Sequence, residues 1–124
     1  MKKLFLLFAV LFQISSFAQI QKVWDKTLSS LEYDEPVFIY KNALGGVDVI
    51  SSIRGAGFDV DVAYGQLDYW FCRLDKNGQI IAGSNKTYGG TGNDSPRSAV
   101  KSPDGGYLIC GTSTSNASGT CSAY

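Results

Sequence analysis

The chain has 124 residues, no histidine, and equal numbers of acidic and basic residues, eleven of each. The absence of His excludes Ser-His-Asp and Cys-His nucleophile systems, and without a Cys-x-x-Cys pair the usual zinc sites are excluded too. The basic residues stand singly among acidic ones, so the chain lacks the basic patch that a nucleic-acid partner requires.

Residues 1–18 have the layout of a cleavable secretory signal peptide. Lys2 and Lys3 form a positive n-region, residues 4–12 are apolar, and a small-x-small cleavage site ends at Ala18. This apolar run is much shorter than the roughly 20 residues that a membrane-spanning helix needs. We therefore expect export, cleavage after Ala18, and a mature chain without a membrane span, secreted or held at the outer cell surface.

The mature chain contains an internal repeat. Positions 24–64 align with positions 84–124 without a gap, and several identities fall on turn-forming residue types. The identical pairs are Lys26/Lys86, Thr27/Thr87, Asp34/Asp94, Pro36/Pro96, Lys41/Lys101, Gly45/Gly105, Gly46/Gly106, Ala63/Ala123 and Tyr64/Tyr124. The paired Asp and Gly residues, together with Trp70, are expected to be structural markers of the repeat. We expect a first repeat, with a preceding strand, over residues 19–88 and a truncated second repeat over residues 89–124.

Within one period, short β-type runs alternate with turns. The predicted strands are residues 37–41, 47–53, 68–74, 79–82 continuing towards 88, 97–101 and 107–112. In the run that contains Trp70, apolar side chains alternate onto both faces, as in a sheet that is covered on both sides. Four strands in about 60 residues fit one blade of a β-propeller.

A propeller closes with roughly four to eight blades, and this chain supplies about one and a half. We therefore expect an all-β fold of antiparallel, four-stranded, blade-like repeats that is incomplete by itself. Such repeats bury their faces against neighbours, so further repeats of the same kind are the expected partners. The sequence is interpreted as the N-terminal fragment of a longer protein or the product of a shortened gene.

Four motifs carry a family resemblance. They are Trp-Asp-Lys-Thr at 24–27, Asp-Tyr-Trp-Phe-Cys-Arg-Leu-Asp-Lys-Asn-Gly at 68–78, Lys-Thr-Tyr-Gly-Gly-Thr-Gly-Asn-Asp at 86–94 and Asp-Gly-Gly-Tyr-Leu-Ile-Cys-Gly at 104–111. Together they resemble the propeller-like repeat regions of large secreted bacterial proteins that often carry a C-terminal type IX secretion sorting domain. The resemblance implies an extracellular or outer-surface protein with a role in adhesion or scaffolding. The sequence departs from the family in having no counterpart of the sorting domain.

Carboxylates are the candidates for metal binding and catalysis. Asp59 and Asp61, with Asp68 and Gly65, offer oxygen ligands for a calcium loop, but their alternation with apolar residues favours a solvated strand over residues 58–62.

The acids Glu32, Asp34 and Glu35 offer a pair for glycoside hydrolysis. However, Asp34 and Asp94 occupy equivalent places in turn-like segments, where Asp caps backbone N–H groups. We therefore expect no catalytic residue, metal or cofactor.

Exposed aromatic residues are the candidate ligand contacts. Tyr33, Tyr64 and Tyr88 lie in or beside loops, where their rings could stack on a glycan or a protein partner, or else cap the edges of the blades. The favoured function is a secreted or cell-surface, non-catalytic binding or structural module. The alternatives are an extracellular glycan-active enzyme that uses carboxylates, and a truncated product without an independent function.

Three cysteines complete the candidates. Cys72 and Cys110 are expected to be small buried residues within strands, and a disulfide between Cys110 and Cys121 is the alternative.

Overall fold

A computed structural model describes residues 21–116, and this part of the chain is all-β, without a helix. The strands are β1 (Tyr33–Lys41), β2 (Val47–Arg54), β3 (Asp68–Arg73), β4 (Lys86–Tyr88), β5 (Asp94–Lys101) and β6 (Tyr107–Ser113). They form two antiparallel sheets, in the orders β1-β2-β3-β4 and β5-β6. The prediction of an all-β, antiparallel fold is confirmed, and neither sheet closes on itself within the described residues. No helix in residues 21–116 could cross a membrane.

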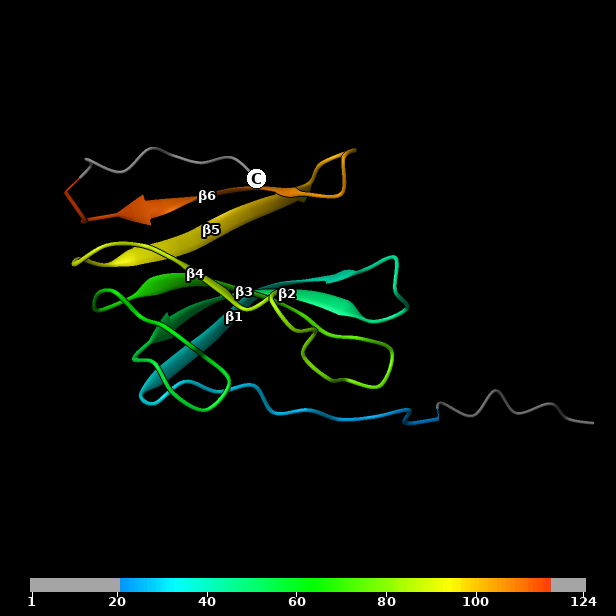
Figure 1. The fold of residues 1–124 in the computed structure, drawn as a ribbon. Coiled ribbons are helices and arrows are strands. Elements are labelled where there is room, and N and C mark those ends of the chain that lie inside the picture. Colours follow the sequence, from blue (N-terminus) through cyan, green and yellow to red (C-terminus); the bar gives the residue numbers. More distant parts are fainter. Residues whose placement is uncertain (1–20, 117–124) are drawn as a thin grey trace, which may run out of the picture.

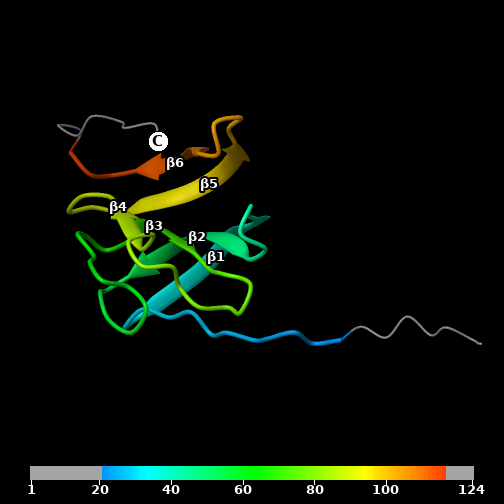
Figure 2. The same ribbon diagram turned by 45° about the vertical axis from the view of Figure 1, so that its right-hand side comes forward.

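The two sheets are layered. The β5–β6 hairpin lies over one face of the four-stranded sheet, and the segment that leads into β1 runs along the other side (Figures 1 and 2). The four-stranded sheet is therefore the central layer of the molecule.

Glycines set the turn between β1 and β2. The Asn42 N–H donates to the Gly46 carbonyl at 3.0 Å, and Gly45 has a φ of 80°, which a residue without a β-carbon adopts most easily. A β-carbon on Gly46 would overlap the Leu74 carbonyl oxygen. Glycine is thus required at position 45 by the backbone conformation and at position 46 by the lack of space for a side chain.

The turn between β5 and β6 contains the other two predicted glycine markers, Gly105 and Gly106. Its backbone is the same as that of the first turn: the Ser102 N–H donates to the Gly106 carbonyl at 2.9 Å, and Gly105 has a φ of 91°. The side-chain bond differs, because the Gly106 N–H donates to the Asp104 carboxylate at 3.0 Å, whereas the Gly46 N–H donates to a side chain four residues earlier. Gly105 and Gly106 therefore depart from full equivalence with the first glycine pair, although both turns have one backbone geometry.

The two long hairpins have the same register. In β1–β2, Pro36 pairs with Ser51, and the ladder shifts just after Pro36. In β5–β6, Pro96 pairs with Gly111, and the ladder shifts just after Pro96. Every pair of the β5–β6 ladder has its aligned counterpart in β1–β2. Proline has no N–H to give to a ladder, which is why both irregularities occur at this residue.

The fourth strand differs from its predicted position. Within residues 79–82, only an isolated bridge pairs with the region of β3, and the ladder resumes at β4. Gly83 has a φ of 78°, and the Ser84 Oγ lies 3.1 Å from the Arg73 N–H and 3.2 Å from the Arg73 carbonyl oxygen. The Arg73 carbonyl still accepts from the Ile81 N–H at 2.8 Å, but the Arg73 N–H donates to the Ser84 side chain instead of to a backbone carbonyl. The predicted continuous strand is therefore wrong.

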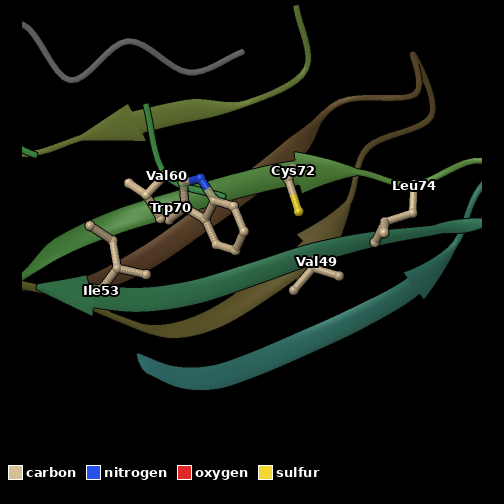
Figure 3. Close-up of a cluster of buried hydrophobic side chains, with 6 residues drawn as sticks. All are labelled: Val49, Ile53, Val60, Trp70, Cys72 and Leu74. Atoms are coloured by element: carbon tan, nitrogen blue, oxygen red, sulfur yellow. The ribbon is translucent and has the colours of Figure 1, made fainter. Parts of the chain in front are cut away.

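Apolar side chains pack on both faces of the central sheet, as its residue pattern predicts. The cluster on the face away from β5–β6 is shown in Figure 3 and consists of Val49, Ile53, Val60, Trp70, Cys72 and Leu74. The cluster between the two sheets has Ile50, Ala99 and Tyr107 at its centre. Burial of both faces, rather than alternation with solvent, stabilises the layered arrangement.

A buried carboxylate joins the two layers. Asp48 on β2 is 0% exposed; it accepts two hydrogen bonds from the Arg73 guanidinium, at 2.7 and 2.8 Å, and one from the Tyr107 hydroxyl at 2.8 Å. Burial alone would raise the pKa of Asp48, but the hydrogen bonds from Arg73, Tyr107 and Asn42 outweigh it and lower the pKa. Asp48 therefore stays ionised in the interior and fixes β6 above β2 and β3.

The cysteines have unlike surroundings. Cys72 is buried as predicted, and burial, with the charges of Asp59 and Asp48, raises the pKa of its thiol to about 12. The prediction is wrong for Cys110, which is exposed because its side of β6 points away from the central sheet. Cys121 lies outside the described residues, and so does the predicted bridge to it.

Candidate functional site

One end of the molecule carries the longest loop, residues 55–67. There β1, β3 and β5 begin, and β2, β4 and β6 end. Leu67 and Asn93 form a parallel bridge at this end, and the Asp94 N–H donates to the Leu67 carbonyl at 2.8 Å. We call this surface, formed by residues 29–33, 55–67, 88–93 and 114–116, the loop end.

The three candidate tyrosines all lie at the loop end. Tyr33, Tyr64 and Tyr88 are 46%, 55% and 37% exposed. Tyr33 begins β1 and Tyr88 ends β4, so these two rings stand at opposite edges of the four-stranded sheet, and Tyr64 lies in the loop before β3. The structure therefore spreads the rings across the loop end rather than bringing them into one cluster.

Tyr33 is held by a neighbour. Its hydroxyl donates to the Glu35 carboxylate at 3.2 Å, and this hydrogen bond raises the pKa of Tyr33. The ring is thus oriented along the exposed start of β1, where Glu32, Asp34 and Glu35 also lie.

Three aspartates at the starts of strands hold the preceding loops by hydrogen bonds to the loop backbone. The carboxylates of Asp34, Asp68 and Asp94 each accept a hydrogen bond from the backbone N–H four residues earlier, at 2.9, 2.7 and 2.8 Å. The repeat alignment points to Asp34 and Asp94 and misses Asp68. The common signal is an Asp at or near the start of a strand that follows a loop, which Asp68 shares. These three acids are occupied in capping the loops of the loop end.

Two of these aspartates lie close together in the interior. Asp68 is 0% exposed and Asp94 is 5% exposed. A β-carbon on Gly89 would overlap the Asp68 Oδ1 and lie 3.0 Å from the Asp94 Oδ2, so only glycine fits between them. Among the described residues, the Asp68 Oδ1 has no hydrogen-bond partner.

The pKa values of the two carboxyl groups are shifted in opposite directions. Burial raises the pKa of Asp68, and the charge of Asp94 adds to the shift, against the two backbone hydrogen bonds that Asp68 accepts. For Asp94, burial is outweighed by hydrogen bonds from Ser113, Ser115 and Gly90, which lower the pKa. A split of this kind is typical of acid–base catalysis. Here the burial of both groups keeps a sugar from reaching them, so the pair belongs to the interior of the fold.

The calcium alternative finds little support in the geometry. Asp59 accepts hydrogen bonds from the Lys26 ammonium at 2.9 Å and from the Ser29 N–H at 3.2 Å. In residues 21–116, no three Asp, Glu or Cys side chains gather as a metal site would require. The predicted strand over residues 58–62 is also wrong, because Phe58 has a φ of 52° within a turn that buries Val60.

A shallow groove lies along β1, on the face of the central sheet away from β5–β6. It has a volume of about 230 Å³ and is lined by apolar groups between the N-terminal segment and the sheet, chiefly Leu28, Pro36, Ile39, Val49 and Trp70. Ile39, at its rim, is 64% exposed. We call it the edge groove. The sequence does not predict this groove, because the first repeat is expected to have a preceding strand, whereas residues 21–32 contain none and one wall of the groove is this irregular segment.

Comparison of the chain with protein-family models, with curated proteins and with solved structures finds no match in any of the three. Geometry and residue chemistry are thus the basis for the function.

Proposed function

We propose that this chain is an exported, non-catalytic β-repeat module that acts in adhesion or scaffolding through the loop end. Its units are blade-like, about 60 residues long, and packed face to face in the manner of a β-propeller. This proposal extends the resemblance to the repeat regions of secreted bacterial proteins.

The observation that carries the proposal is the shared register of the two hairpins. Their ladders correspond pair by pair in the repeat alignment, down to the irregularity after Pro36 and Pro96. The capping bonds to Asp34 and Asp94 start from Ser30 and Gly90, which the same alignment pairs. The strands, the turn and the capping bond all correspond at the same shift along the sequence. This agreement favours a repeat over two unrelated hairpins.

The surfaces favour binding over catalysis. The edge groove, at about 230 Å³, is below the roughly 300–1,000 Å³ that is usual for small-molecule sites. The buried acids are held by Arg73 or by backbone N–H groups, and the exposed aromatic rings of the loop end lie in a loop or at the ends of strands. Aromatic rings on loops above a rigid sheet are suited to stacking on glycans or on a protein partner.

A binding assay tests the role of the loop end. The purified mature chain would be tested on insoluble cellulose and chitin and on collagen-coated and fibronectin-coated surfaces. We expect retention on at least one of these, and a roughly tenfold loss of retention in the double variant Tyr33→Ala/Tyr64→Ala. The matched control is Leu44→Ala, which removes a side chain that is 58% exposed at the opposite end of the sheet.

Equal retention of the double variant and the parent would contradict a role for the loop end. Release of sugar from either polysaccharide, abolished by changing one Asp, would instead support the glycan-active alternative. Thermal unfolding of the same preparation, followed together with its mass in solution, addresses the third alternative, since a product without a function of its own would show no cooperative transition.

A further inference from the structure

The β5–β6 hairpin has an exposed apolar surface. Ala99, Tyr107 and Ile109 face the central sheet, and the residues that alternate with them point away. Among the latter, Val100 is 53% exposed and Leu108 is 54% exposed. We call the side formed by Val100, Leu108, Cys110 and Thr112 the outer face.

The outer face corresponds to a surface that is covered elsewhere in the same chain. In the repeat alignment, Val100, Leu108 and Cys110 are paired with Tyr40, Asp48 and Ile50, which lie between the two sheets. The surface that covers them includes Ala99 and Tyr107, whose aligned counterparts are Ile39 and Val47. Ile39 lines the edge groove, and Val47 packs against the cluster on that same face. The outer face is thus exposed, and the corresponding face of the central sheet is open only at the edge groove, where Ile39 is 64% exposed beside the N-terminal segment.

Three contacts of the internal interface predict how these two surfaces would meet. The Tyr40 hydroxyl donates to the Ala99 carbonyl, the Tyr107 hydroxyl donates to Asp48 at 2.8 Å, and the hydroxyls of Ser52 and Ser95 lie 3.3 Å apart. To deduce the contact between two copies, each internal contact is translated by the repeat alignment. The residue of the first repeat is exchanged for its aligned counterpart in the second, and the residue of the second repeat is exchanged for its counterpart in the first. The resulting pairs are Val100 with Ile39, Leu108 with Val47, and Thr112 with Glu35.

The new pairs are matched in chemistry. The polar pair Asp48 and Tyr107 becomes the aliphatic pair Leu108 and Val47, so neither partner would face an unpaired polar group. The large and small pair Tyr40 and Ala99 becomes two aliphatic residues of middle size. The third pair stays polar on both sides. In each aliphatic pair, both residues differ from their aligned counterparts in a way that keeps the two sides of the contact compatible.

We propose that the outer face of one copy of this chain docks onto the edge groove of a second copy, head to tail. The occupant is a second copy because the contact continues the interface already present between the two sheets. The inference rests on the repeat packing of the proposed function, and it adds a specific partner surface. A head-to-tail contact is heterologous, so it builds rings or open chains rather than closed dimers.

Complementary variants test this arrangement by sedimentation velocity under reducing conditions, which keep the Cys110 thiol from cross-linking. We expect the parent chain to show a weight-average mass at least about twofold above that of the monomer at tens of micromolar. Ile39→Lys and Leu108→Lys should each remain monomeric, because each removes one half of the contact. An equimolar mixture of the two should form a one-to-one dimer and nothing larger, through the intact groove of one and the intact outer face of the other.

The control Leu44→Lys alters a residue that is 58% exposed and outside both surfaces, and it should assemble as the parent does. A monomeric parent at all concentrations, or a mixture that stays monomeric, would overturn the inference. Circular dichroism melts of each variant exclude loss of the fold as the cause. Retention by the loop end in a strictly monomeric parent would refute the docking while leaving the proposed function intact.

Discussion

Two buried carboxylates of this small protein have opposite electrostatic surroundings. Asp48 is neutralised by a bidentate Arg73, whereas Asp68 is buried beside another acid with one oxygen unpaired among the described residues. The first arrangement favours the ionised form, and the second opposes it. The two sites therefore predict opposite consequences of removing a negative charge.

Asp48→Asn should destabilise the fold by about 3 kcal/mol, because it leaves the Arg73 guanidinium without its counter-charge at the junction of the two sheets. The measurement is the free energy of unfolding from urea titration at pH 7. Asp61→Asn, at an exposed position, is the matched control and should change the free energy by less than about 0.5 kcal/mol. Equal effects of the two substitutions would refute a structural role for the Asp48 network.

Asp68→Asn should stabilise the fold at pH 7, by on the order of 1 kcal/mol, because the amide keeps the capping oxygen and removes a buried, partly unpaired charge. Because the folded state raises the pKa of Asp68, the protonated carboxyl contributes stability to the wild type. This contribution is complete below the pKa of the unfolded state, near 3.9, and is lost as the pH rises through the pKa of the folded state. The advantage of the variant should therefore shrink as pH falls towards 4, measured by urea titration across that range.

Asp94→Asn is the matched comparison with the opposite sign. The lowered pKa of Asp94 means that its contribution is present above about pH 3.9 and is lost as pH falls through the folded value. The variant should be less stable than wild type at pH 7 and approach it in acid. If both substitutions destabilised the protein equally at every pH, the assignment of the two environments would be wrong.

At the scale of elements, backbone requirements set the hairpins. Gly46 and Gly83 are both glycines, but for different reasons. The first lies against the carbonyls of Leu74 and Asp75, and the second has a positive φ in open space. Close approach and conformational preference can thus be separated within one protein.

Gly46→Ala should cost about 3 kcal/mol or more, because its β-carbon would meet a backbone oxygen that cannot move without disturbing the end of β3. Gly83→Ala should cost only about 1–2 kcal/mol, the usual penalty for a left-handed conformation. Unfolding free energies of the two variants provide the measurement. A ratio near one would show that crowding at Gly46 is relieved by small shifts.

The sequence predicts the turns and the adjoining strand ends of the β1–β2 and β5–β6 hairpins well, because their signals are local. It places the strand starts at residues 37 and 97, whereas β1 begins at Tyr33 and β5 at Asp94, so Asp34 and Asp94 lie in strands and not in the predicted turn-like segments. Turn glycines and short β-type runs lie within a few residues of each other. The errors have non-local causes. Val60 is buried by a turn that folds onto the sheet, and Asp68 meets Asp94 only because Leu67 pairs with Asn93. Alternation along the chain carries no information about such contacts, so the acid pair and the edge groove had to come from the structure.

At the scale of the whole molecule, three layers are stacked in the order in which they occur along the chain. The N-terminal segment, the central sheet and the β5–β6 hairpin follow one another along the chain and in space (Figure 1). The residues that precede this stack, 1–20, lie outside the described part, and their role is predicted from the sequence.

Export should remove residues 1–18, so the product secreted from a bacterial host should begin at Gln19. Intact-mass spectrometry of the secreted protein measures this directly. Ala18→Trp should abolish most of the cleavage, because the position before the cut requires a small side chain, whereas Gln19→Ala, just beyond it, should be processed normally. A secreted product that still starts at Met1 would contradict the assignment.

The bond between Asp48 and Tyr107 joins residues 59 positions apart, and this separation has a kinetic consequence. The strands β1 to β3 pair with neighbours in the sequence and can form before β6 is available, so Tyr107 joins a sheet that already holds Arg73 against Asp48. Removing its hydroxyl in Tyr107→Phe should speed unfolding and leave the rate of folding nearly unchanged, as stopped-flow measurement would show. The last layer to arrive would then set how long the folded protein lasts rather than how fast it forms.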